Sequence, residues 1–332
     1  MNDKLKQYRN TMRVIGGVML MWALFFMIFM VIVIGSELFD PSYPTNTLGE
    51  IIGSFVYDAA YLGAFMLPVA FFKLMLNGRR PEPMRFEVKL KRDTLAWIFG
   101  GVACIFAFSL LNNVIMNMIG VPTVSFLEEA MGYTSDSGLV LQFISIALVP
   151  AFCEEFLFRG LILSNLMPYG KGAAIIISSV LFGLMHGNFY QFLYTTVAGV
   201  ILGLVYVVTD SIWCSVLMHM INNSVSVIQT AVVERLTESA SETVFMAVEG
   251  VIFLAGLVSI VYLIIKYGKK ARVPERRAVS RFGDAWETCA ETEFFGISSG
   301  ITHKELAKGF FSPTVILFIV YSMYSAVAVL FA

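Results

Sequence analysis

Residues 153–160 read CEEFLFRG, and they decide how the rest of the chain is interpreted. They place two carboxylates and a guanidinium inside a stretch that is otherwise apolar enough to cross a membrane. A charge near the centre of a bilayer costs about 2.5–3.5 kcal/mol, so three unpaired charges would cost on the order of 8–10 kcal/mol. This cost predicts a buried polar site whose charged groups have partners.

The spacing of the three charged residues separates their roles. Glu155 and Arg159 are four residues apart, so they share one face of a helix and can form an ion pair. Glu154 lies about 100° further around the helix and faces a different neighbour. We therefore interpret Glu155 as a structural residue and Glu154 as the carboxylate that is free for chemistry.

The composition predicts an all-α, polytopic membrane bundle. The 332 residues are 58% hydrophobic and only 14% charged, and the mean hydropathy is +0.77. A soluble domain carries nearly twice that share of charge. The net charge of -1 says nothing about nucleic acid. No basic patch alternates with aromatic residues, so we expect no nucleic-acid partner. The four cysteines form neither a disulfide framework nor a CxxC metal motif.

Nine apolar runs predict nine transmembrane helices. They cover about residues 14–35, 51–76, 94–119, 139–166, 173–186, 189–208, 212–230, 244–267 and 313–331. The first run is too long for the core of a signal peptide, so we expect the protein to retain it. The runs divide the chain into a three-span region (1–138), a four-helix catalytic core (139–230) and a C-terminal region (231–332).

The charges of the loops assign the two sides of the membrane. Basic residues gather in the N-terminus, in 77–93, at Lys171 and in 268–311, whereas the loops between them are acidic. Because basic loops stay in the cytoplasm, the N-terminus and a segment over 268–311 should be cytoplasmic, and the C-terminus should lie outside.

Three motifs with chemical potential stand on three separate predicted spans. They are EExxxR from Glu154, FxxxH from Phe182 to His186, and HxxxN from His219 to Asn223. Each contains a pair at i and i+4, which lies on one face of a helix. Polar pairs on apolar helices indicate a bundle interior or a water-filled cavity.

Three further features concern packing. Pro150 lies four residues before Glu154, and because proline has no N–H it should kink the helix and leave a free carbonyl near the site. Gly199 and Gly203 have the spacing of a close helix–helix contact. Asp58, in the second predicted span, is interpreted as a satisfied polar packing group.

The polar residues of the three motifs can together hydrolyse an amide. A desolvated Glu154 can act as a general base on water, and a histidine can orient that water. A second histidine and the Asn223 amide can donate to a developing oxyanion. A catalytic zinc held by Glu154, His186 and His219 is an alternative. However, the HExxH motif is absent, so we expect a site without a cofactor.

The three motifs resemble the CPBP family, which includes the CAAX prenyl endopeptidases and bacterial bacteriocin-processing or immunity proteins. The resemblance covers about residues 139–228. It implies a glutamate-dependent intramembrane protease that cuts a peptide or membrane-protein substrate in the lipid bilayer of a bacterial cell membrane.

The resemblance also implies a role for each residue of the motifs. Glu154 would be the general base together with His186. His219 and Asn223 would stand on the oxyanion side. The supporting residues would be Glu155, Arg159 and Phe182.

Two other functions remain open at this point. A proton-coupled transporter could use glutamate and histidine as a relay, but it predicts an inverted repeat, which the sequence does not display. A membrane scaffold or bacteriocin-immunity protein could keep the fold without catalysis. In either case His219 and Asn223 could serve as polar contacts between helices.

Overall fold

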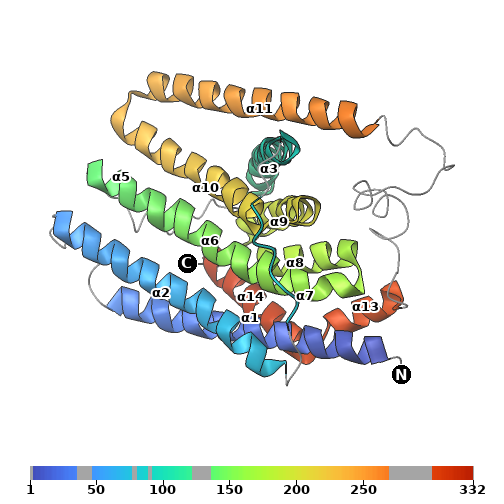
Figure 1. Ribbon diagram of the computed structural model, residues 1–332. Coiled ribbons are helices and arrows are strands. Elements are labelled where there is room, and N and C mark those ends of the chain that lie inside the picture. The colour runs from blue at the N-terminus through green and yellow to red at the C-terminus, as the bar shows by residue number, and fades with distance from the viewer. Residues whose placement is uncertain are drawn as a thin grey trace.

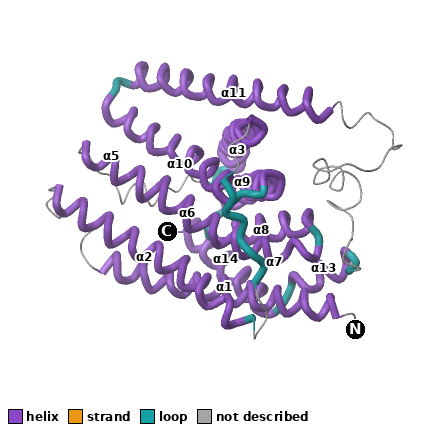
Figure 2. Tube along the Cα trace, in the orientation of Figure 1, coloured by secondary structure: helices purple, strands orange, loops and turns teal. Residues whose placement is uncertain are grey.

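A computed structural model describes residues 3–35, 47–76, 81–88, 92–121, 136–268 and 301–331. Within these ranges the chain is helical throughout, apart from short loops, turns and the extended segment 81–88, and it contains no strand (Figure 2). The all-α membrane bundle predicted from composition is thereby confirmed.

The helices follow the predicted apolar runs. Outside the fourth run they are α1 (Asp3–Gly35), α2 (Thr47–Met75), α3 (Arg92–Ile119), α8 (Lys171–Met185), α9 (Phe189–Thr209), α10 (Ile212–Arg235), α11 (Glu238–Gly268), α13 (His303–Phe310) and α14 (Pro313–Phe331). The fourth run is built from α5 (Asp136–Gln142), η1 (Phe143–Leu148), α6 (Val149–Glu155), η2 (Phe156–Leu163), α7 (Ser164–Leu166) and η3 (Met167–Tyr169).

The number of full spans differs from nine. Among the described residues, seven helices are long and apolar enough to cross a membrane, and α13 with α14 gives an eighth if that pair, bent by 63°, counts as one span. The remaining predicted span is α8, whose 15 residues fall short of the roughly 20 that a bilayer requires. Because α8 is short, its C-terminal end can stop within the bundle.

The helices pack in two groups around the segment α5–α7 (Figure 1). One hydrophobic cluster joins α1, α2 and α14 to α6, η2 and α8. A second, smaller cluster joins α3, α9 and α10, and α11 lies along α3. The helix with the two glutamates therefore contacts both groups.

The predicted close contact at the glycines of α9 is present. A Cβ atom on Gly199 would lie 3.0 Å from the Cα of Ser179, and one on Gly203 would lie 3.3 Å from the side chain of Ile175. Both neighbours belong to α8. The small residues bring α8 and α9 together, which places the backbone of α9 beside the charged helix.

The extended segment 81–88 runs in front of the helices in the middle of the view, from beside α9 toward α1 (Figure 1). The Arg85 carbonyl accepts a hydrogen bond from the Ile212 amide at 2.8 Å, and the Phe86 carbonyl accepts one from the Trp213 indole at 3.1 Å. The start of α10 thus holds this segment in place.

The predicted cytoplasmic segment 268–311 is only partly described, because residues 269–300 lie outside the described ranges. Its last part forms α13, which begins with a capping box at Thr302 and Glu305. Tyr8 of α1 donates a hydrogen bond to the Leu306 carbonyl at 2.8 Å. This part of the segment is therefore packed against the first helix.

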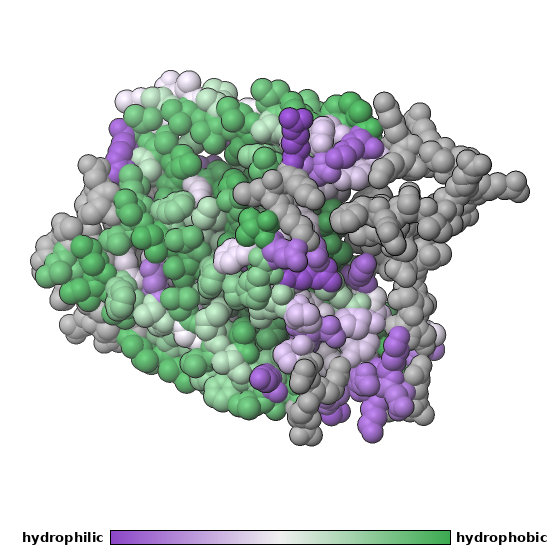
Figure 3. Space-filling model, in the orientation of Figure 1, coloured by the Kyte–Doolittle hydropathy of each residue, from purple (hydrophilic) through white to green (hydrophobic). Residues whose placement is uncertain are grey.

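The surface has the distribution expected of a membrane protein. Hydrophobic side chains cover most of the visible face, and hydrophilic ones gather toward the end where the N-terminus and α13 lie (Figure 3). Large apolar side chains project outward from the long helices, for example Leu74 and Leu254, which are 72% and 63% exposed. Such a belt matches contact with lipid.

Candidate active site

The two glutamates are the last residues of α6, a short α-helix between the π-helices η1 and η2. π-helical turns are rare and often occur at functional sites. Pro150 lies in the first turn of α6 and has no N–H to offer the Ile146 carbonyl four residues earlier. That carbonyl accepts a hydrogen bond from Asn223 Nδ2 at 3.2 Å.

Glu155 contacts both Arg159 and His219 through one carboxylate oxygen. Its Oε1 atom lies 2.8 Å from Arg159 Nη1 and 2.9 Å from His219 Nδ1. The predicted i,i+4 ion pair is therefore present, and Glu155 and Arg159 are 0% and 1% exposed. Because a carboxylate only accepts hydrogen bonds, His219 must carry a proton on Nδ1. This contact orients Nε2 of the same ring toward Glu154.

Arg159 ties the charged helix to α8 and α9. Its Nη2 atom donates to the Gly199 carbonyl at 3.0 Å, and its guanidinium carbon lies 4.7 Å from the centre of the Phe182 ring. A guanidinium over an aromatic face gains a cation–π attraction, which is stronger in desolvated surroundings. Arg159 thus neutralises the charge of Glu155 and fixes the position of the helices around it.

The two carboxylate oxygens of Glu154 have different neighbours. Its Oε1 atom accepts a hydrogen bond from the Tyr61 hydroxyl of α2 at 2.6 Å. Its Oε2 atom is buried and has no hydrogen-bond partner among the described residues, and it lies 3.9 Å from His219 Nε2. That distance is too long for a direct hydrogen bond, but a water molecule can contact both atoms across it.

His186 lies at the C-terminal end of α8. Its Nδ1 atom is 2.9 Å from the Phe182 carbonyl, which can only accept, so this nitrogen carries a proton and Nε2 of the neutral ring is an acceptor. His186 interacts electrostatically with both Glu154 and His219. The ring of Phe182 packs edge-on against both imidazoles, with centroid distances of 5.0 and 5.9 Å.

The structure brings together most, but not all, of the predicted site residues. Glu154, Glu155, Arg159 and His219 form one contact cluster, with Phe182 against it and His186 beside it. Asn223 is half-buried, and its hydrogen bonds go to the η1 backbone and to Asn222; among the described residues it makes no hydrogen bond to either carboxylate. An amide nitrogen has two hydrogens, so Asn223 retains a second donor.

Sequence reasoning missed Tyr61 and underestimated Asp58. Both belong to α2, outside the three motifs, and the only signal was a group of polar side chains within an apolar run (Tyr57, Asp58, Tyr61). Asp58 lies beside Ser145 of η1, and its Oδ1 atom is buried without a hydrogen-bond partner in the described part of the chain. Asp58 is therefore not the fully satisfied packing group that we expected.

In the ranges that the structure covers, no three His, Cys, Asp or Glu side chains are arranged to hold a metal ion. His219 Nδ1 is engaged by Glu155, and His186 Nδ1 by the Phe182 carbonyl. These contacts leave the Nε2 atom of each ring as its remaining nitrogen.

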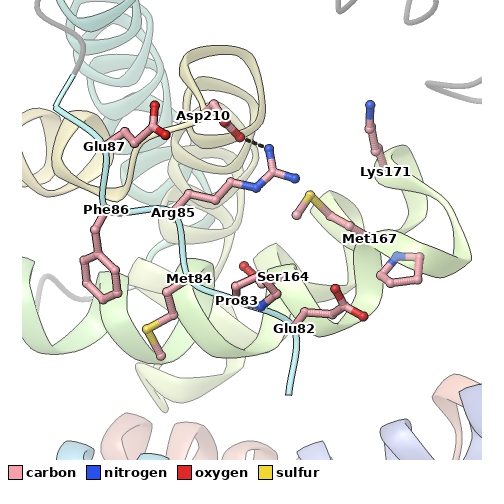
Figure 4. Close-up of a pocket in the computed structure, with 11 residues that line it drawn as sticks. Glu82, Pro83, Met84, Arg85, Phe86, Glu87, Ser164, Met167, Lys171 and Asp210 are labelled. Atoms are coloured by element: carbon pink, nitrogen blue, oxygen red, sulfur yellow. Dashed lines mark hydrogen bonds and ion pairs between the residues drawn. The ribbon is translucent and has the colours of Figure 1, made fainter. Parts of the chain in front are cut away.

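A cavity of about 440 Å³ lies away from the carboxylates. It is lined by the segment 81–88, by the end of the fourth span around Ser164 and Met167, and by Lys171 (Figure 4). An ion pair between Arg85 and Asp210 crosses it. None of the predicted site residues lines this cavity, so it is distinct from the carboxylate site.

Comparison with known proteins finds similarity to the same group of proteins that the three motifs resemble. Residues 136–225 match the family model of the type II CAAX prenyl endopeptidase Rce1-like proteins. The membrane-embedded CAAX protease MroQ of Staphylococcus aureus (strain USA300) is 24% identical over 167 residues, which cover 47% of this chain and 67% of that protein. No solved structure matches the chain. The residues that match the family model contain all three motifs but not α2.

Proposed function

We propose that this chain, which belongs through its residues 136–225 to the CPBP family of membrane CAAX proteases, cuts peptide bonds by a glutamate-dependent hydrolysis inside the membrane. The substrate is a peptide or a membrane-associated protein whose chain enters the helix bundle. The arrangement that supports this function most strongly is the Oε2 atom of Glu154, which is buried without a protein partner and faces His219 Nε2 at 3.9 Å.

Glu154 serves as the general base in this proposal. A water molecule between Glu154 Oε2 and the histidines gives one proton to the carboxylate while its oxygen attacks the carbonyl carbon of the peptide bond. His186 assists by accepting a hydrogen bond from this water at Nε2. Its Nδ1–H is held by the Phe182 carbonyl, so Nε2 is the nitrogen with the lone pair. The first step forms a carbon–oxygen bond and a tetrahedral oxyanion.

His219 serves on the oxyanion side. Glu154 and Glu155 carry two negative charges against the single positive charge of Arg159, so a protonated His219 neutralises the cluster. Its Nδ1–H is fixed by Glu155, which leaves Nε2–H to donate to the oxyanion, with the second hydrogen of the Asn223 amide as a further donor. When the oxyanion collapses, the carbon–nitrogen bond breaks and the proton on Glu154 passes to the leaving amine.

The proposed activity is tested with the purified protein in lipid vesicles. A library of peptides that each contain an apolar segment is incubated with the protein, and the products are analysed by mass spectrometry. We expect complementary fragment pairs whose masses sum to that of the substrate plus one water. Intact peptides after incubation with folded protein would contradict the proposal and favour the scaffold or the transporter.

We also propose that the chain lies in a bacterial cell membrane with its N-terminus in the cytoplasm. The motivation is the alternation of basic and acidic loops. Cys289 lies in the basic segment, outside the described residues. In a variant whose other three cysteines are alanine, an impermeant thiol reagent should leave Cys289 unlabelled in intact cells and label it after lysis.

A positive control for this labelling comes from the opposite side. The same cysteine-poor background with Cys289→Ala and Ser239→Cys carries its thiol at an exposed position in the first turn of α11, on the side assigned to the outside. This thiol should react in intact cells. Rapid labelling of Cys289 and protection of the Ser239→Cys thiol would invert the proposed orientation.

A further inference from the structure

The Tyr61 hydroxyl reaches the base from outside the motif-bearing region. It donates to Glu154 Oε1 at 2.6 Å across a separation of 93 residues. This length is typical of an O–H···O⁻ bond to an ionised carboxylate, which is roughly twice as strong as a neutral hydrogen bond. Tyr61 belongs to α2, whereas the region that matches the family model begins only at residue 136.

The Tyr61 ring is held on several sides by aromatic neighbours. Its centroid lies 4.8 Å from the stacked ring of Phe65, 5.9 Å from Tyr57 and 6.4 Å from Phe26 of α1, edge-on. The side chain is only 7% exposed. Packing of α1 against α2 therefore restricts the ring, and the hydroxyl has a fixed direction toward Glu154.

We propose that Tyr61 is a positioning residue for the hydrolysis. By occupying Oε1, it fixes the carboxylate plane and leaves Oε2 as the oxygen that faces His219 and receives the proton from water. This inference rests on the proposed function, because it assigns the acting oxygen of the proposed base. It also makes α1 and α2 part of the catalytic unit, which is incomplete with residues 136–225 alone.

Without the Tyr61 bond, the carboxylate loses its fixed orientation. Oε1 then has no tyrosine donor, and rotation about the last side-chain bond exchanges the two oxygens. A displacement of about 1 Å at a reacting group can cost on the order of 100-fold in rate. The substrate is not touched by Tyr61, so its binding should change little.

The test compares Tyr61→Phe with wild-type protein and with Tyr8→Phe. Tyr8 is also a buried tyrosine whose hydroxyl donates one short bond, at 2.8 Å to the Leu306 carbonyl, but it lies between α1 and α13. We expect Tyr61→Phe to lower kcat about 10- to 100-fold per folded molecule, with KM within about twofold, whereas Tyr8→Phe should keep the wild-type kcat.

The possible outcomes separate this inference from the proposed function. If wild-type and Tyr61→Phe proteins cleave at the same rate per folded molecule, the inference is wrong and the proposed function stands. A change confined to folded yield, with kcat unaltered, assigns Tyr61 a purely structural role and also overturns the inference. If the wild-type protein cleaves no peptide, the proposed function fails, and the inference fails with it.

Discussion

Glu154→Gln protein is expected to lose peptide hydrolysis almost completely, with kcat lowered by about 10²–10⁴-fold, the usual contribution of a general base. Glutamine keeps the size of the side chain, and its carbonyl oxygen can still accept the Tyr61 hydroxyl bond that Glu154 Oε1 accepts. It cannot take a proton from water at the second position. Expression and melting temperature should therefore remain close to those of the wild type.

Glu249→Gln is the matched control for this variant. Glu249 also lies in an apolar helix, α11, and is half-buried, but it takes no part in the carboxylate cluster. Its replacement should leave kcat unchanged in the same vesicle assay. Equal loss of activity in both variants would show that the assay responds to general damage and not to removal of the base.

Arg159→Ala is expected to destabilise the protein and to lower activity together. The substitution leaves Glu155, which is 0% exposed, without its positive partner, and breaking a buried ion pair in this way costs about 3–5 kcal/mol. It also removes the hydrogen bond to the Gly199 carbonyl and the contact with Phe182. The yield of monodisperse protein and the melting temperature should both fall.

Arg85→Ala provides the comparison for Arg159→Ala. It breaks the ion pair between Arg85 and Asp210. The Arg85 side chain is 35% exposed and the Asp210 side chain is 45% exposed. Pairs in contact with water contribute only about 0–1 kcal/mol, so the melting temperature should shift little. If both arginine variants lose stability equally, burial is not what makes the Glu155–Arg159 pair important.

Glu155→Gln should resemble Arg159→Ala more closely than Glu154→Gln. Glutamine at this position leaves the buried guanidinium without its counter-charge and weakens the contact that orients His219. The melting temperature and the rate of cleavage should therefore both fall. A stable but inactive Glu155→Gln protein would indicate that the two carboxylates have exchanged the roles assigned to them.

The sequence could predict those parts of the site that depend on spacing within one helix. The four-residue interval fixes Glu155 and Arg159 on one face, and their 2.8 Å contact follows from it. The penalty for charge in a bilayer likewise predicts that these groups are buried and paired. Apolar length predicts where the chain is helical, since eight of the nine runs each coincide with one helix and the fourth with a succession of α-, π- and 3₁₀-helical elements.

The contacts between helices could not be predicted from the sequence alone. Periodicity identifies the polar face of a helix but not the neighbour that this face meets. Tyr61 therefore gave little signal, although it makes the shortest bond to Glu154. Likewise, His219 stands between both carboxylates, and Asn223 turns to the Ile146 carbonyl. The predicted bounds of α8 agree with the helix, but counting this run as a full span was wrong, because its 15 residues are fewer than a bilayer requires.

The most direct test of the central claim is hydrolysis in water enriched in ¹⁸O by wild-type and Glu154→Gln proteins at equal folded concentration. In the proposed mechanism the attacking oxygen comes from water and the proton goes to Glu154. The wild-type protein should therefore produce fragments with ¹⁸O in the new carboxyl terminus, and Glu154→Gln should produce almost none over the same time. Labelled fragments formed by Glu154→Gln at the wild-type rate would contradict the account.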